Sequence, residues 1–146
     1  MKDYSKAKIY SIRSAQTDKV YIGSTTETLA RRLATHRNHY NSWKNGIRKY
    51  VASFELLQYP EYYIELVENH PCEGIEELGR REGEVTRLTP NYVNKKIEGR
   101  TPAEYREDHK EIKNQKFDCE CGSPYTHSNK QRHLKTKKHQ NWINNN

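Results

Sequence analysis

Hydrophobic and polar positions alternate in three short segments of the first seventy residues. A period of two residues runs through KIYSIR (8–13), VYIGS (20–24) and EYYIELVEN (61–69), which is typical of half-buried β-strands. The polar segment 14–19 separates the first two and predicts a hairpin over 8–24. The sequence therefore predicts a small three-stranded sheet, mixed or antiparallel.

Two longer segments have helical spacing, so the predicted class of this domain is α+β. In residues 25–40, Thr25 or Thr26 would cap a helix whose apolar face is Leu29, Ala30 and Leu33. In residues 74–89, which Pro90 ends, the apolar stripe consists of Ile75, Leu78, Val85 and Leu88. Helices flanking the sheet would give this part of the chain its core.

The composition changes after residue 100, and we predict domain boundaries there. Thr101, Pro102 and Glu104 form a strong helix start, so residues 101–116 are interpreted as a polar connector helix. From Phe117 the chain is rich in Cys, His and Lys. The predicted organisation is a domain over 1–100, the connector over 101–116 and a small appended module over 117–141.

The appended module contains a candidate zinc site. Its four candidate ligands have the spacing C-x-C, eleven residues, then H-x5-H, and are Cys119, Cys121, His133 and His139. Two thiolates and two imidazoles suit tetrahedral Zn²⁺, and a metal would stabilise a segment that has almost no apolar core. His127 is a spare imidazole that could replace one of them, and the alternative is a disordered basic tail.

Charge is distributed unevenly along the chain, which carries +7 overall from 26 basic and 19 acidic residues. Residues 1–50 are net +8, residues 51–99 are net −5, and residues 122–146 contain no acidic residue. This distribution favours contact between nucleic acid and the two ends of the chain. The candidate phosphate contacts in the module are Lys130, Arg132, Lys135, Lys137 and Lys138.

The chain shows no hydrophobic run that would serve as a secretory leader or a membrane span. Its three Cys do not form a disulfide framework. We therefore expect an intracellular protein without a membrane partner.

One acidic residue interrupts the apolar stripe of the 74–89 helix. Glu82 follows Leu78 by four residues and precedes Val85 by three. A carboxylate on a buried face is costly unless it is paired or binds a metal. The sequence leaves both interpretations open, with Arg32, Arg80 or Arg81 as the alternative structural partner.

Four polar side chains are expected to converge at one end of the sheet. Tyr10 and Tyr21 lie on paired strands, and Arg32 and His36 share a helix face because they are four residues apart. Gly23 has no side chain, so it would let a phosphate backbone or the helix approach closely. The alternative is that the tyrosines simply pack across the strands.

This order of motifs resembles the GIY-YIG endonuclease family. K-I-Y, then Y-I-G about ten residues later, R-x3-H on a helix, a later R-E and finally an Asn follow one another over residues 8–97. Lys8 stands where the family name has Gly. The resemblance implies a nuclease that hydrolyses DNA phosphodiester bonds with a divalent cation, Mg²⁺ or Mn²⁺.

The resemblance also implies a role for each site residue. Tyr10 would be the general base or would position the attacking water, with Tyr21 and Gly23 in the same site. Arg32, chosen over Arg31 because it stands four residues before His36, would stabilise the pentavalent phosphate.

The resemblance implies three further roles: assisting the base, binding the metal and supporting the site. His36 would assist or orient the base, and Glu82 would be the sole acidic metal ligand. Asn94 would buttress the site, with Asn91 as the fallback. Two alternatives to a DNA-holding nuclease stay open: an inactive DNA-binding module, and a structure-specific repair nuclease whose zinc module binds a protein.

Overall fold

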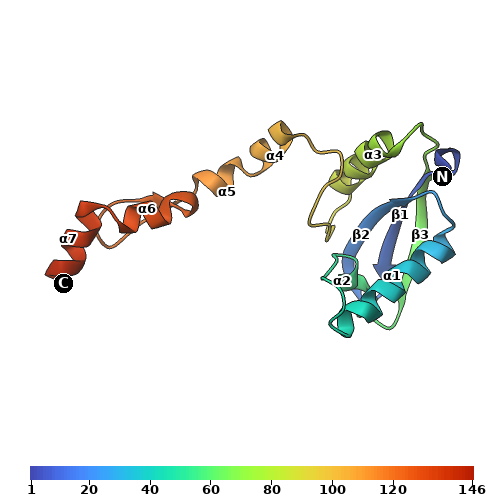
Figure 1. The fold of residues 1–146 in the computed structure, drawn as a ribbon, viewed down its shortest axis with the longest axis horizontal. Helices are drawn as coiled ribbons and strands as arrows, with labels where there is room; N and C mark the ends of the chain where they lie inside the picture. The colour runs from blue at the N-terminus through green and yellow to red at the C-terminus, as the bar shows by residue number, and fades with distance from the viewer. The chain divides into compact units, whose positions relative to one another are not determined.

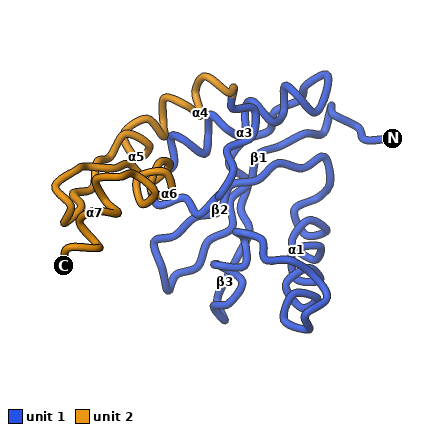
Figure 2. Tube along the Cα trace, turned by 60° about the vertical axis from the view of Figure 1, so that its left-hand side comes forward, with its two compact units in different colours: residues 1–100 blue, residues 101–146 orange.

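A computed structural model describes residues 1–146, which form two compact units, residues 1–100 and 101–146 (Figure 2). The first unit has a short 3-10 helix, three strands and three α-helices (Figure 1). In chain order these are η1 (Tyr4–Lys6), β1 (Lys8–Ser14), β2 (Thr17–Thr25), α1 (Leu29–Lys44), α2 (Phe54–Leu57), β3 (Tyr62–Asn69) and α3 (Ile75–Leu88).

The three strands form one antiparallel sheet in the order β2-β1-β3. The α+β class and the three-stranded sheet predicted from the sequence are therefore confirmed, and the sheet is antiparallel rather than mixed. β1 lies in the centre, which explains why all of its residues except Lys8 and Arg13 are buried. The register pairs Tyr10 of β1 with Gly23 of β2.

Each face of the sheet carries its own hydrophobic cluster, because successive strand residues point to opposite faces. On one face, Ile9, Val20 and Ile22 pack with Leu78 and Val85 of α3. On the other face the cluster contains Tyr10, Ile12 and Leu56, against which Leu29 and Leu33 of α1 pack. Helices on both faces thus hold the site-bearing strands between them.

The helix α1 begins later than the sequence predicted. Thr25 pairs with Lys8 as the last residue of β2, so neither Thr25 nor Thr26 caps the helix. Thr28 is the cap, and its side chain accepts a hydrogen bond of 3.3 Å from the backbone nitrogen of Arg31. Strand pairing extends β2 to Thr25, so the helix can begin only after that residue.

Three residues assigned to apolar helix faces are solvent-exposed. Ile75 and Leu88 at the two ends of α3 are 58% and 80% exposed, and Ala30 of α1 is also exposed. Only Leu78 and Val85 of the predicted α3 stripe are buried. The helix crosses a narrow sheet, so its middle turns alone have strand residues beneath them.

Two glycines attach the segment after α3 to that helix. A Cβ on Gly83 would collide with the backbone oxygen of Glu98, and a Cβ on Gly99, whose φ is +64°, would lie 2.6 Å from Arg80 Cα. This close approach explains why the helix tolerates Gly83 in its middle turns. It also holds Glu98 beside α3.

The second unit contains only short elements. They are α4 (Pro102–Asp108), α5 (Lys110–Asn114), β4 (Lys116–Phe117), β5 (Tyr125–Thr126), η2 (His127–Asn129), α6 (Lys130–Leu134) and α7 (Lys137–Asn145). The segment interpreted as one connector helix is two helices, α4 and α5, which His109 separates. The predicted capping box of Thr101 and Glu104 is present. No helix of the chain combines the length and the hydrophobicity that crossing a bilayer requires.

Candidate active site and metal centre

Tyr10 is the hub of a buried polar network between β1 and α1. Its side chain is fully buried, and its Oη lies 2.7 Å from His36 Nε2. Arg32 Nε donates a hydrogen bond of 2.8 Å to the same oxygen. Arg32 and His36 share one face of α1, as their spacing predicted, and that face meets the strand tyrosine.

His36 connects Tyr10 to a serine that the sequence analysis did not single out. Its Nδ1 lies 3.0 Å from Oγ of Ser53, which is fully buried just before α2. The network is satisfied when His36 carries its proton on Nδ1 and donates to Ser53. Nε2 then has a free lone pair that accepts from Tyr10. The serine thus fixes the tautomer that points a proton acceptor at the tyrosine.

Burial keeps both members of this pair neutral. Burial lowers the pKa of His36 to about 3, with a smaller contribution from the nearby Arg32 charge. Burial also raises the pKa of Tyr10 to about 12, although the Arg32 charge opposes that rise. The positive charge beside Tyr10 is therefore too weak, by itself, to convert the phenol to a phenolate at neutral pH.

Tyr21 and Gly23 of β2 complete the tyrosine side of the site. The Tyr10 and Tyr21 rings lie 6.5 Å apart between centroids. Burial raises the pKa of Tyr21, and the neighbouring Tyr10 adds to the rise. A Cβ on Gly23 would lie 2.5 Å from Tyr10 Oη. The space that the glycine leaves is taken by the phenol of its cross-strand partner, whereas the sequence analysis expected a phosphate backbone or a helix there.

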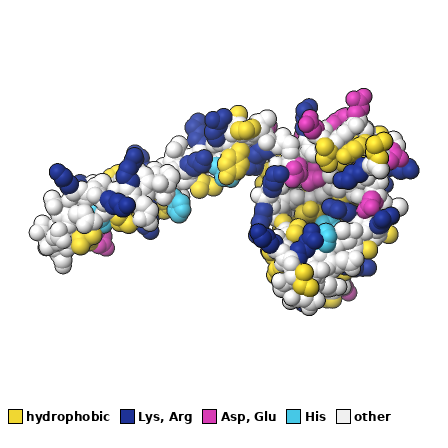
Figure 3. Space-filling model, viewed as in Figure 1, with side chains coloured by type: hydrophobic (Ala, Val, Ile, Leu, Met, Phe, Trp, Pro, Cys, Tyr) yellow, Lys and Arg dark blue, Asp and Glu magenta, His cyan; other side chains and the backbone are white.

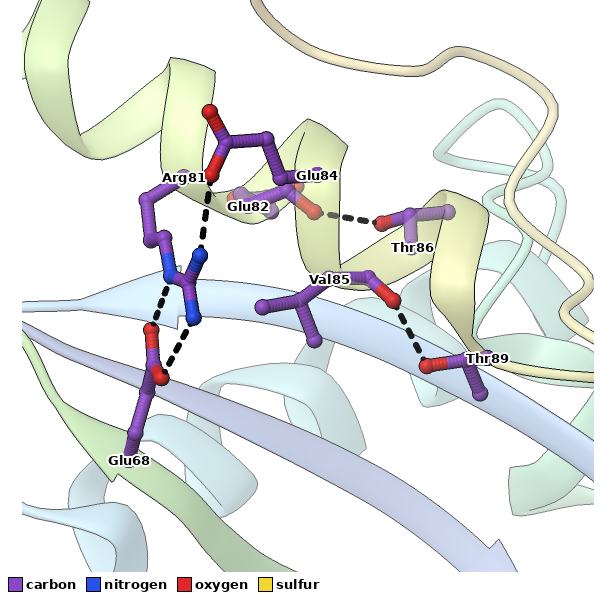
Figure 4. Close-up of polar contacts among 7 residues, drawn as sticks. All are labelled: Glu68, Arg81, Glu82, Glu84, Val85, Thr86 and Thr89. Atoms are coloured by element: carbon purple, nitrogen blue, oxygen red, sulfur yellow. Dashed lines mark hydrogen bonds and ion pairs between the residues drawn. The ribbon is translucent and has the colours of Figure 1, made fainter.

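Glu82 of α3 is half-buried, and its partner is a serine rather than an arginine. Ser24 Oγ donates a hydrogen bond of 2.5 Å to Glu82 Oε2. Arg81 instead clamps Glu68 through two hydrogen bonds of 2.5 and 2.9 Å and reaches Glu84 at 2.9 Å (Figure 4). Arg81 thus pairs with Glu68 and Glu84, and Glu82 has no ion-pair partner.

A cavity of about 920 Å³ joins these groups. Its lining includes Tyr21, Gly23, Arg32, Glu82 and Glu98. Tyr10 and His36 are not part of the lining, because they lie buried behind it. The cavity therefore combines an arginine, a phenol and two carboxylates on its wall with a neutral Tyr–His pair beneath.

The donor set around Glu82 fits a divalent cation. Burial raises the pKa of Glu82, and the Glu98 charge adds to this rise although Ser24 opposes it. Two like charges on one cavity wall are unfavourable until a cation lies near them. Carboxylate oxygens are the ligands that Mg²⁺ prefers, and Mg²⁺ takes few of them because it retains water.

Asn94 binds the backbone of β2 from outside the sheet. Its Oδ1 accepts from the Ile22 nitrogen at 3.0 Å, and its Nδ2 donates to the Ile22 oxygen at 2.7 Å. These two bonds replace a neighbouring strand and hold Ile22 between Tyr21 and Gly23. Asn91, the fallback candidate, instead donates to Asp18 at 3.0 Å and has a φ of +58°.

The second unit brings the four predicted zinc ligands together. The ligand atoms of Cys119, Cys121, His133 and His139 all lie within 4.8 Å of one another. Tetrahedral zinc with ordinary bond lengths separates its ligand atoms by roughly 3.3–3.8 Å. The cluster therefore has the composition and size of a site for a metal such as zinc. The spare imidazole, His127, lies in η2 and is outside the cluster.

Local features explain how such a short segment forms the cluster. Gly122 has a φ of +75°, and its nitrogen donates to the Cys119 oxygen at 2.8 Å, which closes the turn after the cysteines. Thr136 caps α7, so the H-x5-H spacing spans the junction between α6 and α7. Each helix delivers one histidine.

The basic side chains of this unit remain in solvent. All five predicted phosphate contacts are exposed or partly exposed: Lys130, Arg132, Lys135, Lys137 and Lys138. Lys138 also donates to the Gly122 oxygen at 3.2 Å. Figure 3 shows further Lys and Arg side chains on the drawn face of residues 1–100, around hydrophobic and histidine side chains.

Sequence reasoning missed three residues of the site: Ser24, Ser53 and Glu98. Ser24 adjoins Gly23 on β2 and carried a positional signal, whereas Ser53 meets His36 only through the tertiary fold. Glu98 reaches the cavity because Gly83 and Gly99 seat its segment on α3. That close packing has no signature in a single sequence.

Comparison with known families gives one match. The model of the GIY-YIG catalytic domain matches residues 6–69. No curated protein and no solved structure shows significant similarity to the chain. The matched residues contain β1, β2, α1, α2 and β3, and thus the Tyr10, Arg32 and His36 network.

Proposed function

We propose that this chain, whose residues 6–69 are a GIY-YIG catalytic domain, is a metal-dependent endonuclease that hydrolyses DNA phosphodiester bonds. The observation that carries the proposal is the cavity whose wall combines Arg32 and Glu82 in front of the buried Tyr10–His36 pair. Phosphodiester hydrolysis requires a group that binds a metal cation, a group that binds the anionic phosphate and a group that accepts a proton.

In this proposal Glu82 holds Mg²⁺ or Mn²⁺, which would polarise the scissile phosphate and neutralise the leaving oxygen. Ser24 orients the carboxylate through its hydrogen bond to Oε2. Glu98, on the same wall, attracts the cation by charge. The half-buried site strengthens these interactions because water screens them less than it would at the surface.

Arg32 binds the phosphate in this account. Its Nε is fixed on Tyr10 Oη, which leaves its terminal amino groups for phosphate oxygens. Guanidinium suits this role because it stays charged and presents several donors in one plane. Its contribution increases as negative charge develops on the phosphate in the transition state.

Tyr21 at the cavity wall accepts the proton of the attacking water and passes its own proton to Tyr10, which in turn passes its own proton to His36 Nε2. The Tyr21 ring lies 6.5 Å from the Tyr10 ring between centroids, and Tyr10 Oη lies 2.7 Å from His36 Nε2. The water becomes acidic only as its oxygen bonds to phosphorus, so weak acceptors suffice late in the step. Asn94 keeps Tyr21 in position through Ile22.

The C-terminal unit binds DNA in this proposal, with zinc as its structural ion. Its five basic side chains favour a polyanion over a protein partner. One active site per chain cuts one strand. A break of both strands requires a second chain, a second encounter or a reorientation.

Nicking of supercoiled plasmid in Mg²⁺ tests the function directly. The full chain should nick, and Glu82→Gln should reduce the rate at least about 100-fold. Glu76→Gln, on the exposed side of the same helix, is the matched control and should nick normally. Absence of nicking by the folded, zinc-loaded wild type would leave a DNA-binding module.

A further inference from the structure

The turn that follows α1 is closed by a regular hydrogen-bond pattern. The Gly46 nitrogen donates to the Trp43 oxygen, and the Ile47 nitrogen donates to the Ser42 oxygen, both at 2.9 Å. Gly46 has a φ of +73°. These are the two bonds and the left-handed residue of a Schellman motif. The turn is therefore a defined structure that holds Ile47 in one place.

Ile47 lacks the contact that normally accompanies this motif. The residue at its position usually packs on an apolar side chain one turn back in the helix, but the residue there is Ser42. Ile47 is 80% exposed. The backbone fixes an apolar side chain in solvent without any intramolecular gain from burying it.

An aromatic cluster packs around Trp43, the residue that begins the turn. Trp43 lies 5.5 Å from Phe54 and 5.6 Å from Tyr50 between ring centroids, and Tyr40 lies 5.7 Å from Trp43. Phe54 is buried, so the cluster is anchored in the core of the unit. A side chain can be inserted into a partner only from such a rigid support, because a flexible loop would fold back instead.

Only cations flank the exposed isoleucine. Lys44, Arg48 and Lys49 are all exposed, and residues 41–54 contain no Asp or Glu. Lys95 adds a further cation, 4.3 Å from the centroid of the Tyr50 ring. An apolar tip between cations complements a duplex, whose phosphates border a stack of apolar base faces.

The turn follows the C-terminal end of α1, whereas Arg32 lies in the first turn of that helix. Burial lowers the pKa of His39, and the charges of both Arg48 and Arg32 add to this effect. His39 is thus within electrostatic reach of the turn on one side and of the phosphate-binding arginine on the other. At about 1.5 Å per helical residue, Arg32 and Ile47 lie about 20 Å apart, so a duplex that runs along α1 would meet them roughly six base pairs apart.

We propose that Ile47 is a wedge that enters the base stack of the DNA duplex roughly six base pairs from the cleavage site, with Lys44, Arg48 and Lys49 on the flanking phosphates. This inference rests on the proposed DNA endonuclease function. Partial unstacking would kink the duplex and bring the scissile phosphate into the cavity. Proteins that kink DNA insert apolar side chains of this kind.

The test compares the full chain with Ile47→Ala, Ile47→Leu and Leu88→Ala. Leu88 is the matched control because it is equally exposed, at 80%, on another element. The first readout is plasmid nicking below saturation. The second, in a Glu82→Gln background that cuts at least about 100-fold more slowly, is permanganate oxidation of unstacked thymines in the bound plasmid.

Ile47→Ala should nick about tenfold more slowly and abolish the permanganate signal, with the salt dependence of binding unchanged because no charge is removed. Ile47→Leu should restore both, and Leu88→Ala should match the wild type. Normal nicking and an unchanged thymine pattern in Ile47→Ala would overturn the wedge alone. A change only in self-association or in binding to anionic vesicles would do the same. A wild type that neither nicks nor binds plasmid would overturn the endonuclease function itself.

Discussion

Tyr10 Oη lies 2.7 Å from His36 Nε2, and both side chains are buried. This pair links the central strand of the sheet to α1, so the same contact supports the fold and forms the base of the cavity. Its neutrality has measurable consequences for stability, because burial acts on the pKa of both groups.

Acid should destabilise the first unit through His36. Its folded pKa is lowered to about 3, below its unfolded value, so folding favours the neutral imidazole. The resulting stability is present above about pH 6.5 and is lost as the pH falls toward the folded pKa. Between pH 7 and pH 4 we expect a loss of about 3 kcal/mol that a His36→Gln variant does not share.

Urea unfolding at each pH measures this difference. Trp43 fluorescence in a Trp142→Phe background reports the first unit alone, since the chain has two Trp. All other titratable groups are the same in both proteins, so the difference between the two pH profiles reports His36 alone. Parallel pH profiles for the two proteins would contradict a buried neutral His36.

Gly23→Ala should destabilise the first unit by about 2 kcal/mol. The new Cβ would lie 2.5 Å from Tyr10 Oη and would displace the phenol from His36. Gly74→Ala is the control, because nothing lies within 4 Å of its added Cβ. Equal urea midpoints for the two alanine variants would show that the phenol does not occupy this space.

Zinc removal should unfold the second unit and leave the first intact. Cys121→Ser should weaken zinc binding more than about 100-fold and reduce the helical signal of α6 and α7. His127→Ala should bind one zinc per chain as the wild type does, since His127 is outside the cluster. Zinc content by mass spectrometry and circular dichroism measure both, and full zinc in Cys121→Ser would exclude the proposed ligand set.

The basic side chains of the second unit should determine the salt dependence of DNA binding. Removing one contact between a basic side chain and a phosphate lowers the slope of log K against log salt by about 0.9. Replacing Lys130, Arg132 and Lys135 by Gln should therefore reduce the slope by up to about 2.7. The same number of changes in α4 and α5, at Arg106, Lys110 and Lys113, should reduce it less. Equal slopes for both triple variants would show that these three side chains of the second unit do not contact DNA.

The sequence predicted the strands well, because alternation on β1 and β3 is a local signal that the sheet satisfies. The predicted start of α1 was wrong, since three threonines stand close before the helix and only the pairing of Thr25 with Lys8 decides among them. The predicted burial of the outer turns of α3 was also wrong. Helical periodicity does not reveal how wide the sheet beneath Ile75 and Leu88 is.

Of the candidate site, motif order identified residues that the fold brings together, but it did not reveal their contacts. Tyr10, Arg32 and His36 meet as their spacing suggested. The reason for Gly23 emerged only from the strand register, which sets it opposite Tyr10. Ser53 follows His36 by seventeen residues of helix and loop, a separation over which a single sequence holds no signal of contact.

The nicking rate of Tyr10→Phe is the most direct test of the account, because this change removes one oxygen and keeps the ring that fills the core. Under single-turnover conditions in Mg²⁺ we expect the rate to fall at least about 100-fold with DNA affinity unchanged. A rate within about threefold of the wild type would contradict a catalytic role for the network of Tyr10, Arg32 and His36.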